Sequence, residues 1–184
     1  MPKVMTPLAQ GCEELEAVSI IDLLRRAGIE VITVGLDHAP VKGSHGITLL
    51  PDMPLEEALK QRDFDMVVLP GGLPGADHLD DDPRVGDLLK QMLDSGRFAC
   101  AICAAPRVLA KRGLLDGKKA TAYPGILEKG NFPKIQYTGA PVERDGKIIT
   151  GRGPGTAMDF ALTLIEALTD DTTRKRVEDA LVRP

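Results

Sequence analysis

The sequence predicts an α/β protein of the doubly wound type, with a mostly parallel β-sheet and helices on both faces. Short runs of β-branched and other apolar residues alternate with segments of helical spacing along the whole chain. Most of these runs are continuously apolar, as expected for strands that are buried on both faces. With 184 residues and no linker or internal repeat, we expect one domain spanning residues 1–184.

The predicted elements follow one another in a regular order. Strands are predicted at residues 4–8, 29–36, 64–69, 98–102 and 147–150, with weaker candidates at 120–123 and 135–138. Helices are predicted at residues 13–27, 55–61, 83–93, 105–112, 156–168 and 172–181. Gly28 and Gly113 follow basic helix ends, and Pro83 stands where a helix would begin. Because doubly wound sheets bind ligands at the carboxyl ends of their strands, functional residues are expected in the turns that follow the strands.

Composition and charge exclude several function classes. The formal net charge of −4 provides no general attraction to nucleic acid or to an anionic membrane. Aromatic residues make up 3% of the chain and tryptophan is absent, so stacking platforms for single-stranded nucleic acid are missing. The N-terminus lacks the apolar core of a signal peptide, and no apolar run approaches the roughly 18 residues of a membrane span. We expect a cytoplasmic protein without nucleic-acid or membrane partners.

Cys103 is the most informative residue, because it lies where an apolar strand runs directly into a proline-marked helix start. A thiol at that turn is near backbone N–H groups and a helix N-terminus, which favour the thiolate and lower the pKa of the thiol. This is the layout of a nucleophile elbow with sulfur in place of the serine oxygen. We therefore expect Cys103 to be reactive, the alternative being a buried structural cysteine.

The other two thiols have weaker indications. Three cysteines are odd in number and too few for a disulfide scaffold, which indicates free thiols in a reducing compartment. Cys100 and Cys103 form a C-x-x-C pattern, but side chains three apart on a strand point in opposite directions, so Cys100 is expected in the core. Cys12 precedes the first helix, where it could be exposed and have a redox role.

The first helix carries a carboxylate on its apolar face. Glu16 shares that face with Ile20 and Leu23, whereas Glu13 and Glu14 are explained by the favourable field of the helix N-terminus. Burial raises the pKa of a carboxyl group towards neutrality. Glu16 is therefore a candidate general acid or base.

Two glycine turns fall at the same edge of the sheet. Gly71 and Gly72 follow the predicted strand 64–69, and their backbone N–H groups could form an oxyanion hole or simply a turn. The segment 151–156, G-R-G-P-G-T, lacks the lysine of a phosphate-binding loop and is expected to form a tight turn beside the pocket.

The histidines do not predict a metal centre or a peptidase dyad. All three precede Cys103 in the chain, and none has the spacing of a metal-binding motif: His38, His45 and His78. We expect them on the surface or in loops, and we predict no metal and no cofactor.

Four motifs taken together resemble the ThiJ/PfpI superfamily, specifically its parkinsonism-associated DJ-one branch. They are G-C-E-E-L-E at 11–16, L-P-G-G at 69–72, A-I-C-A-A-P at 101–106 and G-R-G-P-G-T at 151–156. The resemblance covers nearly the whole chain in order. It implies a flavodoxin-like α/β sandwich that forms homodimers, with the active site close to the dimer interface.

The resemblance also implies roles for individual residues. Cys103 corresponds to the reactive cysteine of that branch and Glu16 to its protonated glutamate partner, while Gly72 and Ala104 would supply backbone N–H donors. The chain departs from the family pattern at Tyr123, which replaces a histidine and is a poorer proton carrier at neutral pH. His45 stands where the family often has an arginine at the pocket rim.

The activity implied is cofactor-independent conversion of methylglyoxal or glyoxal to the hydroxy acid, with protein deglycase activity on glycated proteins as an extension. The alternative is a redox sensor or chaperone of the oxidative-stress response, acting through a cysteine sulfinate. A peptidase or amidase is a minor alternative, because peptidase-like members carry histidine directly after the cysteine and this chain has Ala104.

Overall fold

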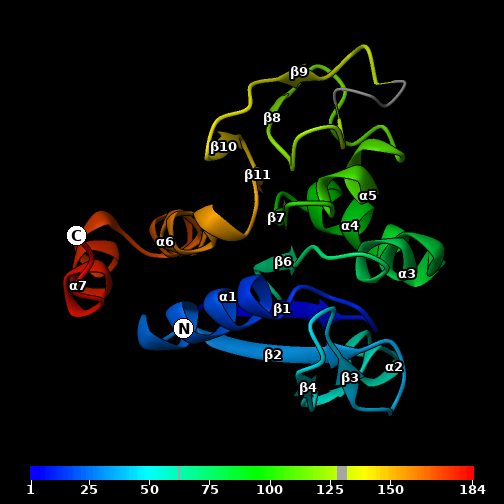
Figure 1. Ribbon diagram of the computed structural model, residues 1–184, viewed down its shortest axis with the longest axis horizontal. Coiled ribbons are helices and arrows are strands. Elements are labelled where there is room, and N and C mark those ends of the chain that lie inside the picture. Colours follow the sequence, from blue (N-terminus) through cyan, green and yellow to red (C-terminus); the bar gives the residue numbers. More distant parts are fainter. Residues whose placement is uncertain (62, 128–131) are drawn as a thin grey trace.

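The computed structural model describes residues 1–61, 63–127 and 132–184. Its described strands build a seven-stranded sheet in the order β10-β11-β7-β6-β1-β2-β5. The paired strands of this sheet are parallel except for β10 and β11, which are antiparallel. This confirms the predicted doubly wound, mostly parallel α/β fold (Figure 1).

The long strands match the apolar runs of the sequence. The central sheet consists of β1 (Lys3–Leu8), β2 (Glu30–Gly35), β5 (Met53–Pro54), β6 (Met66–Leu69), β7 (Phe98–Ile102), β10 (Val142–Asp145) and β11 (Ile148–Gly151). Two small two-stranded sheets lie outside it, formed by β3 (Val41–Lys42) with β4 (Thr48–Leu49) and by β8 (Lys119–Ala120) with β9 (Gln136–Tyr137). The strands β6 and β7 are buried at every position, as continuous apolar runs predict.

Helices cover both faces of the sheet (Figure 1). One face carries α1 (Glu14–Arg26), α6 (Ala157–Leu168) and α7 (Asp171–Ala180), with the short 3₁₀ turn η1 (Pro154–Thr156) leading into α6. The other face carries α2 (Leu55–Ala58), α3 (Gly75–Asp81), α4 (Pro83–Asp94) and α5 (Pro106–Ala110). Each face has its own buried apolar cluster, with Ile20 and Phe160 in one and Leu89 and Val108 in the other.

Some elements differ from the prediction. The helix α3 was not predicted, because G-A-D-H-L-D-D begins with glycine and is largely acidic. The edge strand β10, V-E-R-D, lacks an apolar run because it lies at the rim of the sheet. The weaker predicted strands at 120–123 and 135–138 are reduced to the two-residue pair β8 and β9, outside the central sheet.

The hairpin of β3 and β4 covers the N-terminal end of α1. Cys12 is fully buried there in a cluster with Leu8, Ala17 and Val41, so the expectation that it could be exposed is wrong. Sequence alone missed this because the covering segment comes from about thirty residues further along the chain. In the part of the chain that the structure describes, no helix has the length and apolar character needed to cross a membrane.

Candidate functional site

Cys103 occupies the turn between β7 and α5. Its backbone N–H donates to Gly151 O at 3.0 Å, which joins the turn to the end of the neighbouring strand β11. Its φ angle of 64° lies in the left-handed region that residues other than glycine rarely adopt. Strained backbone of this kind is typical of functional turns and of nucleophile elbows. The residue is 9% exposed, so the thiol lies just below the surface.

The first turn of α1 brings Glu16 to this elbow. Glu16 is fully buried, and its Oε2 accepts a hydrogen bond from the Gly71 N–H at 2.8 Å. The Glu13 N–H in turn donates to Gly71 O at 2.9 Å, so the glycine turn is fastened to α1 at both of its peptide groups. The Oε1 of Glu16 is buried and has no partner of normal hydrogen-bond geometry in the described residues.

Gly71 packs against both Cys103 and Glu16 and leaves no room for a side chain. A methyl group on Gly71 would lie 2.6 Å from Cβ of Cys103 and 2.7 Å from Oε2 of Glu16. Gly72 has a φ angle of 88°, and a methyl group there would lie 2.3 Å from the backbone nitrogen of Glu13. Both glycines are therefore required by close approach, and Gly72 also by its backbone conformation.

Burial governs the protonation of both groups. It raises the pKa of Glu16 to about 7, and the nearby Glu13 contributes, while the Gly71 N–H and the Cys103 thiol act in the opposite direction. Burial and the Glu16 carboxylate raise the pKa of Cys103 to about 12, although the N–H groups of Gly72 and Ala104 lower it. The sequence-based prediction that the pKa of the Cys103 thiol is lowered is therefore wrong when Glu16 is ionised. The helix after the elbow has only five residues, so the favourable effect of its N-terminus on the thiolate is smaller than the opposing effects of burial and of Glu16.

Tyr123 reaches the elbow through its backbone. Its N–H donates to the carbonyl oxygen of Cys103 at 2.9 Å, and Thr121 fixes the segment by donating from its N–H to Thr150 Oγ1 at 2.9 Å. The aromatic ring is about half exposed and lies beside Gly153, where a methyl group would come within 3.4 Å of the ring. The predicted tyrosine and the G-R-G-P-G-T turn are thus neighbours of the cysteine.

His45 makes its contacts with α1 rather than with the thiol. Its Nδ1 lies 3.3 Å from Glu14 Oε2 and 3.4 Å from Glu13 Oε2, and most of its side chain is exposed. A substrate-binding role for His45 stays a prediction.

Glu14 is a functional-looking residue that the sequence did not reveal. It is 3% exposed, and its Oε1 accepts from the backbone N–H groups of His45 at 2.8 Å and Ile47 at 3.1 Å. Burial alone would raise the pKa of Glu14, but these hydrogen bonds and its own N–H lower it to about 2. Helical spacing places Glu14 away from the core, and only the later hairpin buries it.

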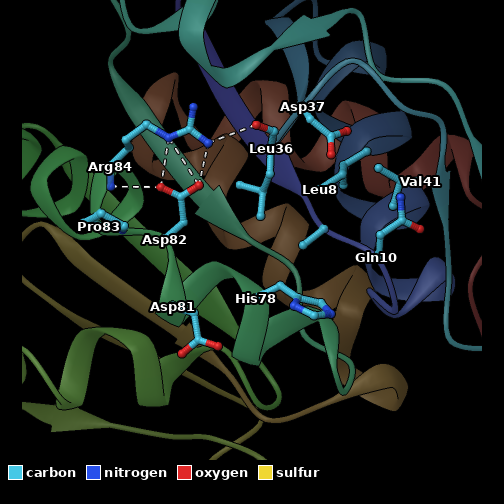
Figure 2. A pocket seen from close by; sticks show the side chains of 11 residues that line it. Leu8, Gln10, Leu36, Asp37, Val41, His78, Asp81, Asp82, Pro83 and Arg84 are labelled. Carbon is cyan, nitrogen blue, oxygen red and sulfur yellow. Dashed lines mark hydrogen bonds and ion pairs between the residues drawn. The ribbon is translucent and has the colours of Figure 1, made fainter.

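A cavity of about 570 Å³ opens beside the ends of β1 and β2 (Figure 2). Arg84 on its wall is already paired with Asp82 at 2.6 Å and bonded to Leu36 O at 3.0 Å. The Oε1 of Gln10 likewise already accepts a hydrogen bond from the backbone N–H of Lys42 at 2.9 Å. None of the three thiols lines this cavity, and the predicted reactive residue Cys103 lies elsewhere, at the elbow.

Fold and site together define a class: flavodoxin-like α/β proteins with a cysteine at a nucleophile elbow and a buried glutamate beside it. Residues 2–167 match the model of the DJ-1/PfpI family, and this chain belongs to that family. The resemblance found in the sequence motifs is thereby confirmed.

Individual relatives are similar over almost their full length. The Parkinson disease protein 7 homolog of Danio rerio is 40% identical over 184 residues, covering 98% of this chain and 96% of the relative. The Caenorhabditis elegans protein named glutathione-independent glyoxalase DJR-1.2 is 35% identical over 159 residues, covering 86% of this chain and 84% of its own. The crystal structure of Drosophila melanogaster DJ-1beta has a TM-score of 0.94 at 40% identity, covering 100% of this chain and 98% of that one.

Proposed function

We propose that this protein is a cofactor-independent glyoxalase, which converts methylglyoxal or glyoxal to the hydroxy acid. The observation that carries the proposal is the buried carboxyl group of Glu16 beside the Cys103 thiol, with Gly71 packed against both residues. The relative named as a glutathione-independent glyoxalase supports it. Deglycase activity on early glycation adducts of proteins would extend the same carbonyl chemistry.

The first step is addition of the thiol to the aldehyde. As Sγ bonds to the aldehyde carbon, the thiol proton passes to the Glu16 carboxylate, which acts as a general base. The N–H groups of Gly72 and Ala104 lie within hydrogen-bond reach of Sγ and are placed to stabilise the developing oxyanion. Return of the proton from Glu16 to that oxygen completes a hemithioacetal.

The second step moves hydrogen within the adduct. Glu16 removes the proton from the carbon bonded to sulfur and returns one to the neighbouring carbon through an enediol, while a hydroxyl proton passes between the two oxygens. One carbon is oxidised and its neighbour reduced, so no external oxidant is needed. Water then cleaves the resulting thioester, releasing the hydroxy acid and restoring the Cys103 thiol.

Tyr123 is assigned to the wall of this substrate site, next to the elbow and the turn at Gly153. Its phenol hydroxyl could also carry a proton to the adduct. The variant Tyr123→Phe separates the two contributions, because it keeps the ring and removes the hydroxyl.

The test is methylglyoxal consumption without glutathione, with chiral detection of lactate. We expect Cys103→Ala and Glu16→Gln each to lower kcat/KM by about 100-fold or more. The matched control is Cys100→Ala, which removes a fully buried thiol from the same strand but not from the elbow. Lactate production that survives either elbow substitution would refute the mechanism.

A second candidate function, a redox sensor with chaperone-like behaviour, is favoured by one specific observation. In the part of the chain that the structure describes, the buried Oε1 of Glu16 has no partner of normal hydrogen-bond geometry, and a protonated Glu16 could donate to an oxygen of a Cys103 sulfinate. Two equivalents of peroxide would oxidise the thiolate to the sulfinate and be reduced to water. Mass spectrometry after mild peroxide should then show two added oxygens on Cys103 before Cys12 or Cys100, and an unmodified Cys103 would exclude this role.

A further inference from the structure

Four polar side-chain atoms converge at the N-terminal end of α1, outside the elbow. The Nδ1 of His45 lies 3.4 Å from Glu13 Oε2 and 3.3 Å from Glu14 Oε2. The Oγ of Ser44 lies 3.3 Å from each of the same two oxygens and 3.1 Å from His45 Nδ1. An imidazole nitrogen, a hydroxyl oxygen and two carboxylate oxygens therefore lie close together, and the ligand atoms of Glu13, Glu14 and His45 are all within 4.8 Å of one another.

Backbone groups orient both carboxylates towards this cluster. The Oε1 of Glu14 accepts hydrogen bonds from the backbone N–H groups of His45 and Ile47. The Oε1 of Glu13 accepts from the Leu15 N–H at 3.3 Å. Each glutamate thus has one oxygen fixed by the backbone and directs its Oε2 into the cluster, which is how outer hydrogen bonds position metal ligands.

Four of the distances within this cluster fit the edges of a tetrahedral metal site. Hydrogen bonds to carboxylates are normally about 2.7–2.9 Å long from a charged nitrogen donor and about 2.5–2.7 Å from a hydroxyl. The contacts of His45 and Ser44 with the two carboxylates, at 3.4 and 3.3 Å, are longer than this. Zinc binds nitrogen and oxygen ligands at about 2.0–2.1 Å, so the edges of a regular tetrahedron around it measure roughly 3.3–3.4 Å. The distances from His45 Nδ1 and Ser44 Oγ to the two carboxylates agree with those edges.

The negative charge of the Glu13 and Glu14 carboxylates also favours a bound cation. Glu14 is almost fully buried, with only 3% of its surface exposed. Within the described residues, the ion-pair contacts of Glu13 and Glu14 are with His45 alone, and neither glutamate meets a lysine or arginine. A buried carboxylate is stable when a metal or a cationic group compensates its charge.

We propose that Glu13, Glu14, His45 and Ser44 form a binding site for a divalent transition-metal ion of the zinc class. The site contains no thiol and is separate from the pair of Cys103 and Glu16. Motif spacing could not predict it, because Glu13 and Glu14 lie at the start of α1, whereas Ser44 and His45 lie in the turn between β3 and β4, and the fold alone brings them together.

The test uses Co²⁺ as a spectroscopic probe on chelator-treated, thiol-reduced full-length protein. We expect one equivalent to bind with the intense d–d absorption of a tetrahedral ion and without a thiolate-to-cobalt charge-transfer band. Zn²⁺ should displace it. His45→Gln, which removes the imidazole of a mostly exposed residue, should weaken binding at least about 10-fold, by analogy with losses around metal sites.

Three comparisons decide the outcome. The matched control His78→Gln removes another exposed histidine, on α3, and should bind like the wild type. Glu13→Gln should reproduce the loss seen for His45→Gln, with far-UV circular dichroism verifying that both variants are folded. Binding that is absent, that persists in His45→Gln, or that disappears in Cys103→Ala with a thiolate band in the wild type would overturn the proposal.

Discussion

Glu16 and Cys103 act as one titrating unit because they share a buried environment. The first proton leaves the pair with a pKa of about 7 and the second only near 12, so the singly protonated pair predominates between these values. In that state the thiol holds the proton and Glu16 is ionised, because the pKa of the thiol is the higher of the two. A proton moving between them as sulfur bonds to carbon is what general base catalysis by Glu16 requires.

The pH dependence of the proposed reaction follows from this pair. Glu16 must be ionised to accept the thiol proton, so kcat/KM for methylglyoxal should rise as the pH increases through about 7 and then level off. The measurement is initial lactate formation between about pH 5 and 9. A profile without a rise in this range would contradict the assignment of Glu16 as the base.

The same raised pKa makes Glu16 a burden on stability at high pH. The folded state holds the Glu16 proton more tightly than the unfolded state, so this contribution is fully present below pH 4.5 and is lost as the pH rises to about 7. Glu16→Gln cannot ionise and should raise the free energy of unfolding at about pH 8 by up to about 3 kcal/mol. Urea denaturation of both proteins at about pH 8 and pH 4 measures this difference in the free energy of unfolding. The same difference at both pH values would show that the ionisation of Glu16 does not affect stability.

At the scale of elements, the turn after β6 joins three segments that are distant in sequence. Gly71 binds Glu16 on α1 through its N–H and touches Cys103 after β7. Gly71→Ala should therefore abolish lactate formation and lower the melting temperature. Gly155→Ala is the matched control for stability in another glycine turn, where a methyl group meets no atom within 4 Å and should leave the melting temperature unchanged.

The sequence could predict Cys103 and Glu16 because local rules place them. The cysteine follows an apolar strand directly, and helical spacing puts Glu16 on the face that packs against the sheet. Glu14 and Cys12 could not be placed in this way, since the hairpin of β3 and β4 buries them from outside the helix. That hairpin pairs strands of two residues each, too short to leave a periodic pattern.

Only part of the fold could be predicted from the sequence, as for the site. Strands that cross the centre of the sheet are continuously apolar and were located within a few residues. The edge strand β10 pairs on one side only, with β11, and keeps a polar sequence. The helix α3 is held by hydrogen bonds to the glycine turns, such as Gly75 N–H to Gly11 O at 3.2 Å, rather than by helix propensity.

On the scale of the whole molecule, α1 exposes apolar side chains next to the covering hairpin. Leu15 is 52% exposed and Val18 47%, and they are three positions apart on one side of the helix. Val18 also lines a hollow of about 290 Å³ together with Leu50, which is 79% exposed. An apolar surface of this kind fits the homodimer that the family resemblance implies.

A charge placed within this apolar surface tests the predicted dimer. Val18→Asp would place a carboxylate within the apolar surface and should shift the protein from dimer to monomer in analytical ultracentrifugation. Lys90→Asp adds the same group on α4, at the opposite face of the sheet, and should leave the mass unchanged. A monomeric wild-type protein would contradict the prediction.

We also predict that residues 1–184 unfold as one domain, because both apolar clusters pack on the same sheet. Far-UV circular dichroism and alkylation of the buried Cys100 should give coincident urea transitions. Separate transitions would show that the chain contains more than one folding unit.

The position of the elbow makes Cys103 a natural reporter of local opening. Cys103 lies just below the surface, whereas Cys100, on the preceding strand β7, is fully buried. A thiol reagent in excess would therefore modify Cys103 whenever the glycine turn separates from α1, and Cys100 only when the sheet itself comes apart. The ratio of the two labelling rates measures how much more often the reactive turn opens than the whole protein unfolds.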